Sequence, residues 1–201
     1  MILKICGITN QEDCDAAIEA GANAIGFNFY TKSPRYIWPE RAGEIRTPEG
    51  VKRVGVFVDE SRPRVESVIA AAALDIAQLH GNESSPLYPR TAPVWKAVRI
   101  DSSTPDFRKY DLDPAVALLL DGPRSGVTFA WALTKGLFRF MQRPHKIILA
   151  GGLDASNVAE AVAKVHPWGV DACSRIESEP GKKDHRKMTE FLQAAMAALH
   201  A

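Results

Sequence analysis

Short apolar runs alternate with longer amphipathic segments from one end of the 201-residue chain to the other. Most of the short runs are almost continuously apolar, which is typical of parallel strands that are covered on both faces. We predict strands over the following ranges: Leu3–Cys6, Ala24–Asn28, Arg53–Val58, Ile76–Leu79, Trp95–Ile100, Val116–Asp121, Lys146–Ala150 and Gly169–Ala172.

The longer segments carry apolar residues at helical spacing. The clearest predicted helices are Glu12–Ala20, Arg62–Ala73, Ser156–Val165 and Lys187–Leu199. Asn10 is the predicted N-cap of the first helix and Gly21 marks its end. Asp154 with Ser156, and Asp184, are the start signals of two further helices.

Strands that alternate with helices along the whole chain favour a parallel sheet with helices outside it. For eight such units we expect closure into a (β/α)₈ TIM barrel, although an open doubly wound sheet would show the same pattern. No linker, low-complexity segment or charge block divides the chain, so residues 1–201 are expected to form one catalytic domain.

The composition argues against several classes of protein. The 25 Lys and Arg residues nearly balance the 24 Asp and Glu residues, so no net field attracts nucleic acid or an anionic membrane. No apolar run approaches the roughly 20 residues that span a bilayer, and the start of the chain lacks a signal-peptide pattern. We expect a cytoplasmic protein whose partner is a small molecule, with neither nucleic acid nor membrane as a partner.

In parallel α/β folds, functional residues gather at the C-terminal ends of the strands. Here these ends carry the thiol of Cys6, the carboxyl of Asp121 and the imidazole of His80, and the guanidinium of Arg35 follows the second strand. Each also has a plain structural interpretation, as packing, a helix cap, a hydrogen-bonding residue or a surface charge. Their occurrence together favours a site.

Gly151 and Gly152, after the seventh strand, are the clearest signal of an anion site. Glycine lets backbone N–H groups approach a phosphate, and a helix start adds partial positive charge. Sugar phosphates in barrels bind at the loops after strands seven and eight, so Ser174 is expected to supply the other half of the site.

The three cysteines stand far apart, without the spacing of a metal site. We interpret Cys14 and Cys173 as small buried hydrophobic residues. A single reactive thiol survives in the reducing cytosol, which leaves Cys6 as the candidate for chemistry.

At its motifs the chain resembles the phosphoribosylanthranilate isomerase family, and the motifs follow the family's order almost from end to end. They are Lys4–Thr9, Gly26–Tyr30, Lys32–Tyr36, Val54–Val58, Gln78–Glu83, Leu149–Leu153 and Pro180–Asp184. The first two are specific to this family, whereas the Gly-Gly-Leu element is shared by many phosphate-binding barrels.

The resemblance implies an Amadori rearrangement of N-(5-phosphoribosyl)anthranilate, a step of tryptophan biosynthesis, without cofactor or metal. It implies that Asp121 is the general acid that protonates the furanose ring oxygen and that Cys6 is the general base that removes the proton from C2′. Arg35 is expected to bind the anthranilate carboxylate, and Gly152 and Ser174 the phosphate. The other expected substrate-binding residues are His80, Gly151, Asp171 and Arg175.

The two catalytic roles have opposite requirements. A free thiol has a pKa near 8.5 and is only about 3% thiolate at pH 7, so a base needs positive charge nearby. Strand parity places Lys4 on the same face as Cys6, and we predict that Lys4 favours the thiolate. Asp121 must hold a proton near neutrality, so burial or adjacent negative charge should raise its pKa.

Two stretches depart from the family pattern. After the sixth strand the glycine-rich turn is shorter, Arg124 replaces one glycine, and Ala130 replaces the Asp before Trp131. After the eighth strand, Cys173 stands where the family has Ser, and Arg175 where it has a Gly that lets the backbone reach the phosphate. Arg175 either binds the phosphate by charge or fills the pocket, and we favour the first because the acid and the base are retained.

Two other functions fit the pattern less well. A related sugar-phosphate isomerase of histidine synthesis would carry Asp where Cys6 stands, and a metal-dependent epimerase would need a cluster of which only His80 is available. A non-catalytic relative that binds phosphorylated metabolites would tolerate loss of the acid and the base, which are both present. The sequence is consistent with a monomer or a homodimer.

Overall fold

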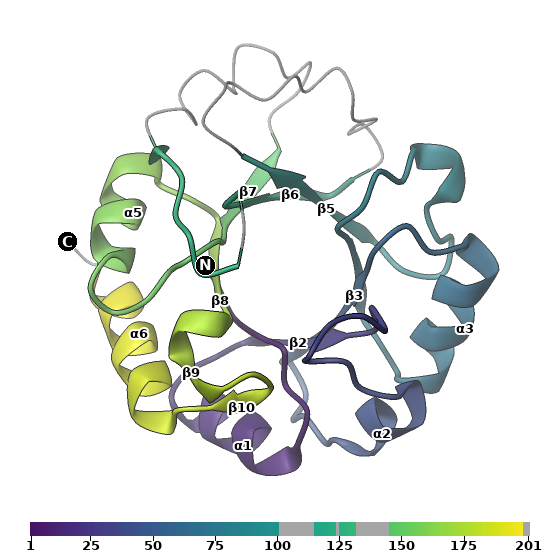
Figure 1. Ribbon diagram of the computed structural model, residues 1–201, viewed down its shortest axis with the longest axis horizontal. Coiled ribbons are helices and arrows are strands. Elements are labelled where there is room, and N and C mark those ends of the chain that lie inside the picture. The colour runs from purple at the N-terminus through teal and green to yellow at the C-terminus, as the bar shows by residue number, and fades with distance from the viewer. Residues whose placement is uncertain (101–114, 124, 132–144, 199–201) are drawn as a thin grey trace.

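The computed structural model describes residues 1–100, 115–123, 125–131 and 145–198 (Figure 1). In this part of the chain, eight parallel strands close into a barrel in sequence order, and β1 pairs with β8. This closure confirms the TIM barrel and excludes the open sheet. The strands are β1 (Ile2–Cys6), β2 (Ala24–Asn28), β3 (Lys52–Phe57), β4 (Ile76–Leu79), β5 (Val94–Arg99), β6 (Ala117–Asp121), β7 (Lys146–Leu149) and β8 (Gly169–Ala172).

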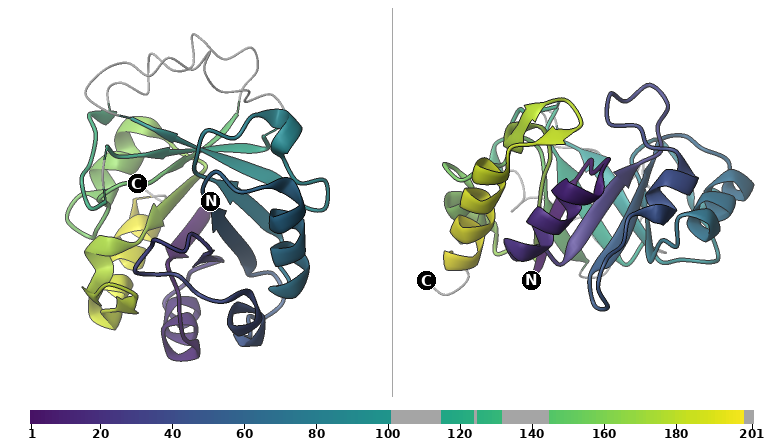
Figure 2. Two further views of the ribbon diagram at one scale, coloured as in Figure 1. Left: turned by 45° about the vertical axis from the view of Figure 1, so that its right-hand side comes forward. Right: turned by 90° about the horizontal axis from the view of Figure 1, so that it is seen from below.

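Helices lie outside the ring of strands, as Figures 1 and 2 show. The described α-helices are α1 (Gln11–Glu19), α2 (Pro39–Glu44), α3 (Arg62–Ala71), α5 (Val158–Val165) and α6 (His185–Ala197). The predicted helices are confirmed with small shifts of their ends, although Leu199 lies outside the described residues. α2 was not predicted from the sequence, because six residues are too few to show helical periodicity.

Two predicted helix starts are confirmed by their hydrogen bonds. The Asn10 side chain accepts a hydrogen bond from the third residue beyond it at 2.8 Å, and Asp184 does the same for α6 at 3.1 Å. The third prediction was wrong in detail. Asp154 accepts from the Ser156 N–H in a turn before α5, and the helix begins after Asn157.

The strands separate two apolar regions. The larger lies between the strands and the helices, and the smaller fills the barrel interior around Trp95, Leu119 and Ile148. Because side chains alternate between the two faces of a strand, the inward positions of β1 are those of Lys4 and Cys6. The same alternation turns inward-facing residues at or next to the ends of other strands, such as Asn28, Gln78 and Asp121, toward the mouth of the barrel, where the site lies.

After β8 the chain forms a short 3-10 helix, η4 (Ser174–Ile176), and a two-stranded hairpin, β9 (Glu177–Glu179) and β10 (Lys182–Lys183). The hairpin was not predicted, because its residues are mostly charged and lack an alternating apolar pattern. Within the described residues, no helix has the length and apolar character needed to cross a membrane.

Candidate active site

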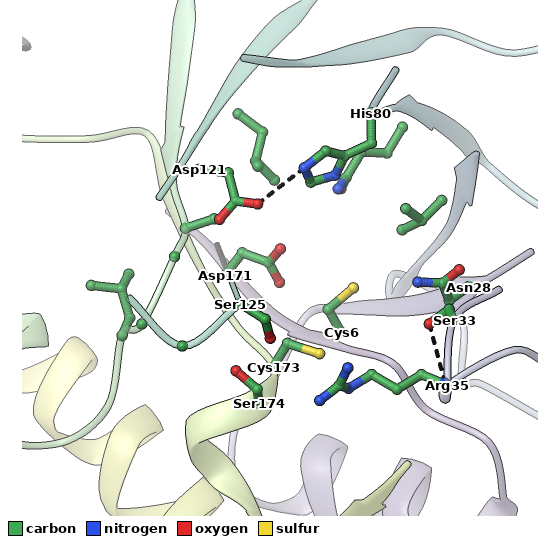
Figure 3. A pocket seen from close by; sticks show the side chains of 18 of the residues that line it. Cys6, Asn28, Ser33, Arg35, His80, Asp121, Ser125, Asp171, Cys173 and Ser174 are labelled. Carbon is green, nitrogen blue, oxygen red and sulfur yellow. Dashed lines mark hydrogen bonds and ion pairs between the residues drawn. The ribbon is translucent and has the colours of Figure 1, made fainter. Parts of the chain in front are cut away.

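A cavity of about 530 Å³ opens at the C-terminal ends of the barrel strands (Figure 3). Every residue predicted for catalysis or substrate binding lines it: Cys6, Arg35, His80, Asp121, Gly151, Gly152, Asp171, Ser174 and Arg175. The structure thus brings the whole predicted set into one place, and their individual roles stay predictions.

Cys6 ends β1 and is 8% exposed. It packs against Gly26 of β2, where a Cβ atom would lie 2.9 Å from Cys6 Sγ and 3.0 Å from Lys4 Nζ. The missing side chain therefore leaves room for the thiol and the ammonium together. A hydrogen bond from Cys173 lowers the pKa of Cys6 well below its ordinary value, against the effect of burial, and the charge of Lys4 lowers it further. Lys4 acts in the direction that we predicted.

The interpretation of Cys173 as a buried hydrophobic residue was wrong. Cys173 is partly exposed, lines the cavity and hydrogen-bonds to Cys6. This bond, together with burial, raises the pKa of Cys173 well above its ordinary value, so it keeps its proton. The sequence held a signal for this, since Cys173 shares strand parity with the inward-facing Asp171. Cys14 is fully buried, as expected, and burial raises its pKa to about 11.

An ion pair joins β1 to β8 beneath the thiols. Lys4 Nζ lies 2.9 Å from Asp171 Oδ2, and the two residues are register partners. Burial lowers the pKa of Lys4, but Asp171 and Cys6 raise it more, so Lys4 stays charged. Burial raises the pKa of Asp171 to about 7 despite Lys4. Asp171 Oδ1 is buried and has no hydrogen-bond partner among the described residues, which leaves it free to accept a bond from a ligand.

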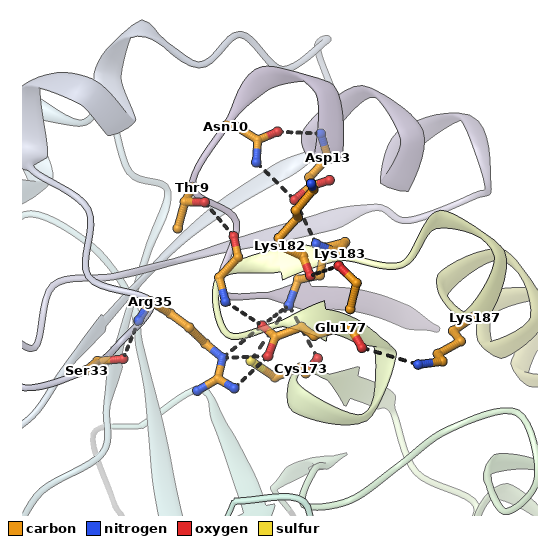
Figure 4. Close-up of polar contacts among 12 residues, drawn as sticks. Thr9, Asn10, Asp13, Ser33, Arg35, Cys173, Glu177, Lys182, Lys183 and Lys187 are labelled. Atoms are coloured by element: carbon orange, nitrogen blue, oxygen red, sulfur yellow. Dashed lines mark hydrogen bonds and ion pairs between the residues drawn. The ribbon is translucent and has the colours of Figure 1, made fainter.

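Arg35 reaches the cavity from the loop after β2, and Glu177 holds it there (Figure 4). Arg35 Nε lies 2.8 Å from Glu177 Oε1, and Nη2 lies 2.6 Å from Oε2. The ammonium of Lys183 contacts the same carboxylate at 2.8 Å. Burial raises the pKa of Glu177, but Arg35 and Lys183 lower it more, so the carboxylate stays ionised. A ligand carboxylate would therefore meet a guanidinium that is already oriented.

On another wall, Asp121 ends β6 and His80 follows β4. Asp121 Oδ2 lies 3.0 Å from His80 Nε2, and Oδ1 accepts a hydrogen bond from the Gly122 N–H at 2.9 Å. The Asp121 side chain is 25% exposed, so the burial that we expected is only partial. The charge of Asp121 helps to raise the pKa of Asp171.

The glycine loop after β7 is packed against the loop after β6. Gly151 and Gly152 have φ angles of 77° and 65°, in the left-handed region that favours glycine. A Cβ atom on Gly151 would lie 2.2 Å from Gly122 N, and one on Gly152 would lie 2.8 Å from Thr128 N. Only glycine fits this close approach of two backbones. Ser174 lies on the adjoining wall at the start of η4.

Arg175 lines the cavity and is also engaged elsewhere. Its Nε donates to Asp154 Oδ2 at 2.5 Å, and its side chain is 46% exposed. Burial raises the pKa of Asp154, but Ser156 and Arg175 lower it more. Binding of phosphate and obstruction of the pocket both stay hypotheses for Arg175. Of the departures after the sixth strand, Arg124 lies outside the described residues.

Comparison with known proteins identifies the family of this barrel. The sequence profile described as "N-(5'phosphoribosyl)anthranilate (PRA) isomerase" matches residues 3–194. The chain belongs to the phosphoribosylanthranilate isomerase family. A relative named N-(5'-phosphoribosyl)anthranilate isomerase, from Solibacter usitatus, is 59% identical, and the match covers 100% of both chains.

Solved structures of family members agree. The phosphoribosyl anthranilate isomerase of Thermus thermophilus is 37% identical and superposes with a TM-score of 0.88, over 99% of this chain and 100% of that one. A second phosphoribosyl anthranilate isomerase was solved in complex with reduced 1-(o-carboxyphenylamino)-1-deoxyribulose 5-phosphate. It is 38% identical, with a TM-score of 0.83, over 98% of this chain and 100% of that one.

Glu83, in the family motif Gln78–Glu83, belongs to a buried ion pair that was not predicted from the sequence. Lys96 Nζ lies 2.8 Å from Glu83 Oε2 and donates to the Gly81 carbonyl at 2.6 Å. Glu83 in turn accepts from the Gly81 N–H. Lys96 is on the helix-facing side of β5, opposite in parity to the barrel interior. The Lys96–Glu83 pair therefore fixes the loop that begins with His80 from the helix-facing side of the barrel.

Three further residues that line the cavity were also missed: Asn28, Gln78 and Arg99. All three stand at inward positions near strand ends, so the parity argument that placed Lys4 beside Cys6 would have found them. Gln78 Oε1 is buried without a hydrogen-bond partner among the described residues and offers a second free acceptor. Within the same residues, no group of three or more His, Cys, Asp or Glu side chains is arranged to hold a metal ion.

Proposed function

We propose that this protein isomerises N-(5'-phosphoribosyl)anthranilate by general acid–base catalysis, with Cys6 as the base and Asp121 as the acid. The observation that supports it is the placement of a thiol with a lowered pKa and a carboxyl group on separate walls of one cavity. The names of its full-length relatives supply the substrate.

The reaction follows from these two positions. Asp121 donates a proton to the furanose ring oxygen, and the ring opens to a Schiff base. Cys6 then takes the proton from C2′, and the resulting enolamine tautomerises to the ketone. Each such proton transfer typically contributes about 100-fold to 10,000-fold. His80, hydrogen-bonded to Asp121, orients the acid.

The two ends of the substrate are assigned to different residues of the cavity wall. The guanidinium of Arg35, fixed by Glu177, binds the anthranilate carboxylate, which is the planar partner that suits it. The backbone around Gly151 and Gly152 binds the phosphate together with Ser174. Arg175 adds positive charge to this phosphate site, where its guanidinium leaves the ion pair with Asp154 and contacts the phosphate instead.

The cavity would operate in the cytoplasm, where reducing conditions keep the thiol of Cys6 free. Because every proposed role falls to residues of one chain, a monomer and a homodimer are both compatible with the mechanism. No step is assigned to a cofactor or a metal.

The deciding experiment measures turnover of freshly prepared phosphoribosylanthranilate, followed by the loss of anthranilate-type fluorescence. The wild-type protein is expected to turn it over. Cys6→Ser should bind the product with little change while losing almost all turnover, because a hydroxyl is a far weaker base than a thiolate. Absence of wild-type turnover, or a fully active Cys6→Ser variant, would overturn the proposal.

A further inference from the structure

The seam between β1 and β8 carries two thiols side by side at the cavity wall. We propose that Cys6 and Cys173 are an oxidation site, at which a hydroperoxide converts the two thiols into a reversible disulfide. This goes beyond the isomerase reaction, which needs only one of the two sulfur atoms.

The strand register brings the two cysteines within bonding range. Ile5 and Ala172 are the last register partners of β1 and β8, and Cys6 and Cys173 are the residues that follow them. Neighbouring strands lie about 4.8 Å apart, whereas disulfides join Cα atoms roughly 4.4–6.8 Å apart. Equal parity turns both side chains to the same face, and Figure 3 shows the two cysteine side chains beside one another at the cavity. Little backbone movement is needed to form the bond.

Cys6 and Cys173 also differ in pKa and in exposure, and this difference favours oxidation of Cys6 first. Cys173 and Lys4 lower the pKa of Cys6 and so favour its thiolate, which is the form that peroxides oxidise. Cys173 keeps its proton and is the more exposed of the two. The cavity of about 530 Å³ opens to solvent and admits a small peroxide. Cys14 has none of these features, since it is fully buried in α1.

The chemistry balances in two steps. The Cys6 thiolate attacks the O–O bond of the hydroperoxide, an S–O bond forms, and the departing alkoxide or hydroxide takes a proton from water. Sulfur is oxidised to sulfenic acid and the peroxide is reduced. Cys173 then attacks this sulfur, the S–S bond forms, the S–O bond breaks, and hydroxide leaves with the Cys173 proton as water. A dithiol reductant restores both thiols.

The disulfide has a consequence for Cys6. A sulfur in a disulfide cannot accept the C2′ proton, so under the proposed function the oxidised enzyme is inactive. It is also protected, because the disulfide forms before a second peroxide drives Cys6 to the irreversible sulfinic acid. The Cys that replaces the family's Ser at position 173 thus makes oxidation at Cys6 reversible.

The test uses the purified full-length protein, hydrogen peroxide, an alkylating quench and mass spectrometry. The wild-type protein should lose two hydrogen atoms, keep one alkylatable cysteine after denaturation, and yield a crosslinked pair of peptides. Cleavage before aspartate residues separates Cys6 from Cys14, because Asp13 lies between them. Turnover should be lost and should return with dithiothreitol.

Two variants make the result specific. Cys14→Ala should form the same crosslink as the wild type. Cys173→Ser should form none, gain two oxygen atoms at Cys6, and stay inactive after dithiothreitol, with circular dichroism as the check on folding. A wild-type protein without the link between positions 6 and 173, or with Cys14 in it, would overturn the proposal. Because mass detects the bond directly, a crosslinked protein that stayed active would contradict Cys6 as the base and leave the oxidation site standing.

Discussion

The β1–β8 side and the β4–β6 side of the cavity differ in how far they bury Cys6 and Asp121 and in which side chains surround them. On the first side, Cys6 is 8% exposed, contacts a second thiol and lies beside the charge of Lys4. On the second side, the Asp121 side chain is 25% exposed and its side-chain partner is His80. The Cys6 thiol thus lies near the ammonium groups of Lys4 and Lys183, whereas the Asp121 carboxyl is partly exposed to solvent.

The difference fits the two roles that we propose for Cys6 and Asp121. A thiol that acts as a base must lose its proton, and a buried ammonium lowers the energy of the resulting anion. A carboxyl that acts as an acid must keep its proton, so a buried cation beside it would impair it. Arg99, the register partner of Asp121, is exposed, and water screens its charge. Under the proposed roles, the group that must lose a proton and the group that must keep one therefore lie on different strands of the barrel.

The largest expected effect comes from removing the acid. Asp121→Asn keeps the size of the side chain but cannot donate the proton, so kcat should fall about 100-fold to 10,000-fold. The pH profile of Cys6 alkylation should stay close to wild type, because the thiol side is untouched. Turnover and alkylation rates are measured on the same preparation. A kcat within a few-fold of wild type would remove Asp121 from the mechanism.

The next effect tests the cation beneath the thiol. Lys4→Met removes a charge that lowers the pKa of Cys6, so that pKa should rise and the alkylation profile should move to higher pH. At a pH below the new pKa, the thiolate fraction falls about tenfold each time the pKa rises by one, and turnover near neutrality should fall with it.

Lys96→Met is the matched control for Lys4→Met. It also deprives a buried carboxylate of its lysine, but Lys96 lies on the outer face of the barrel and contacts Glu83. Its alkylation profile should coincide with that of the wild type even if the protein is less stable. Identical profiles for the wild type and Lys4→Met would show that Lys4 does not act on Cys6.

A smaller effect is expected on the carboxyl side. His80→Asn removes the imidazole that bonds Asp121, and one such hydrogen bond is worth about 0.5–1.5 kcal/mol. We expect kcat to fall about twofold to tenfold, with KM nearly unchanged, in steady-state kinetics. A loss as large as that of Asp121→Asn would mean that His80 itself transfers a proton.

The smallest effect concerns Arg175, two residues beyond Cys173. Because its side chain is 46% exposed, its charge should contribute modestly to phosphate binding. Arg175→Gly should raise KM for the phosphorylated substrate about twofold to fivefold. A lowered KM would instead indicate that Arg175 obstructs the pocket.

The sequence predicted those features of the fold that repeat locally. Continuous apolar runs identified all eight barrel strands, and the caps Asn10 and Asp184 marked their helices correctly. Strand parity placed Lys4 beside Cys6, because neighbouring inward positions on a strand are set by local geometry. The residues predicted for the site, from the motifs and from the strand ends together, all line one cavity.

Contacts between distant segments were not predictable in this way. Arg35 and Glu177 are 142 residues apart, and nothing in either segment indicates the other. The hydrogen bond between Cys6 and Cys173 also depends on the closure of β1 onto β8, which a pattern of single strands does not show. Cys173 was therefore interpreted by its residue type alone, and wrongly.

Because the barrel closes between its first and last strands, the surroundings of Cys6 are completed only after β8 has been synthesised. Cys6 precedes Asp171, Cys173 and Lys183 along the chain and therefore leaves the ribosome before them. Until β8 is made, one edge of β1 is unpaired and Cys6 lacks the neighbours that β8 and the segment after it supply. A nascent chain therefore carries Cys6 with Lys4 but without Cys173 and Lys183, and the full set of neighbours is assembled only when β8 closes onto β1.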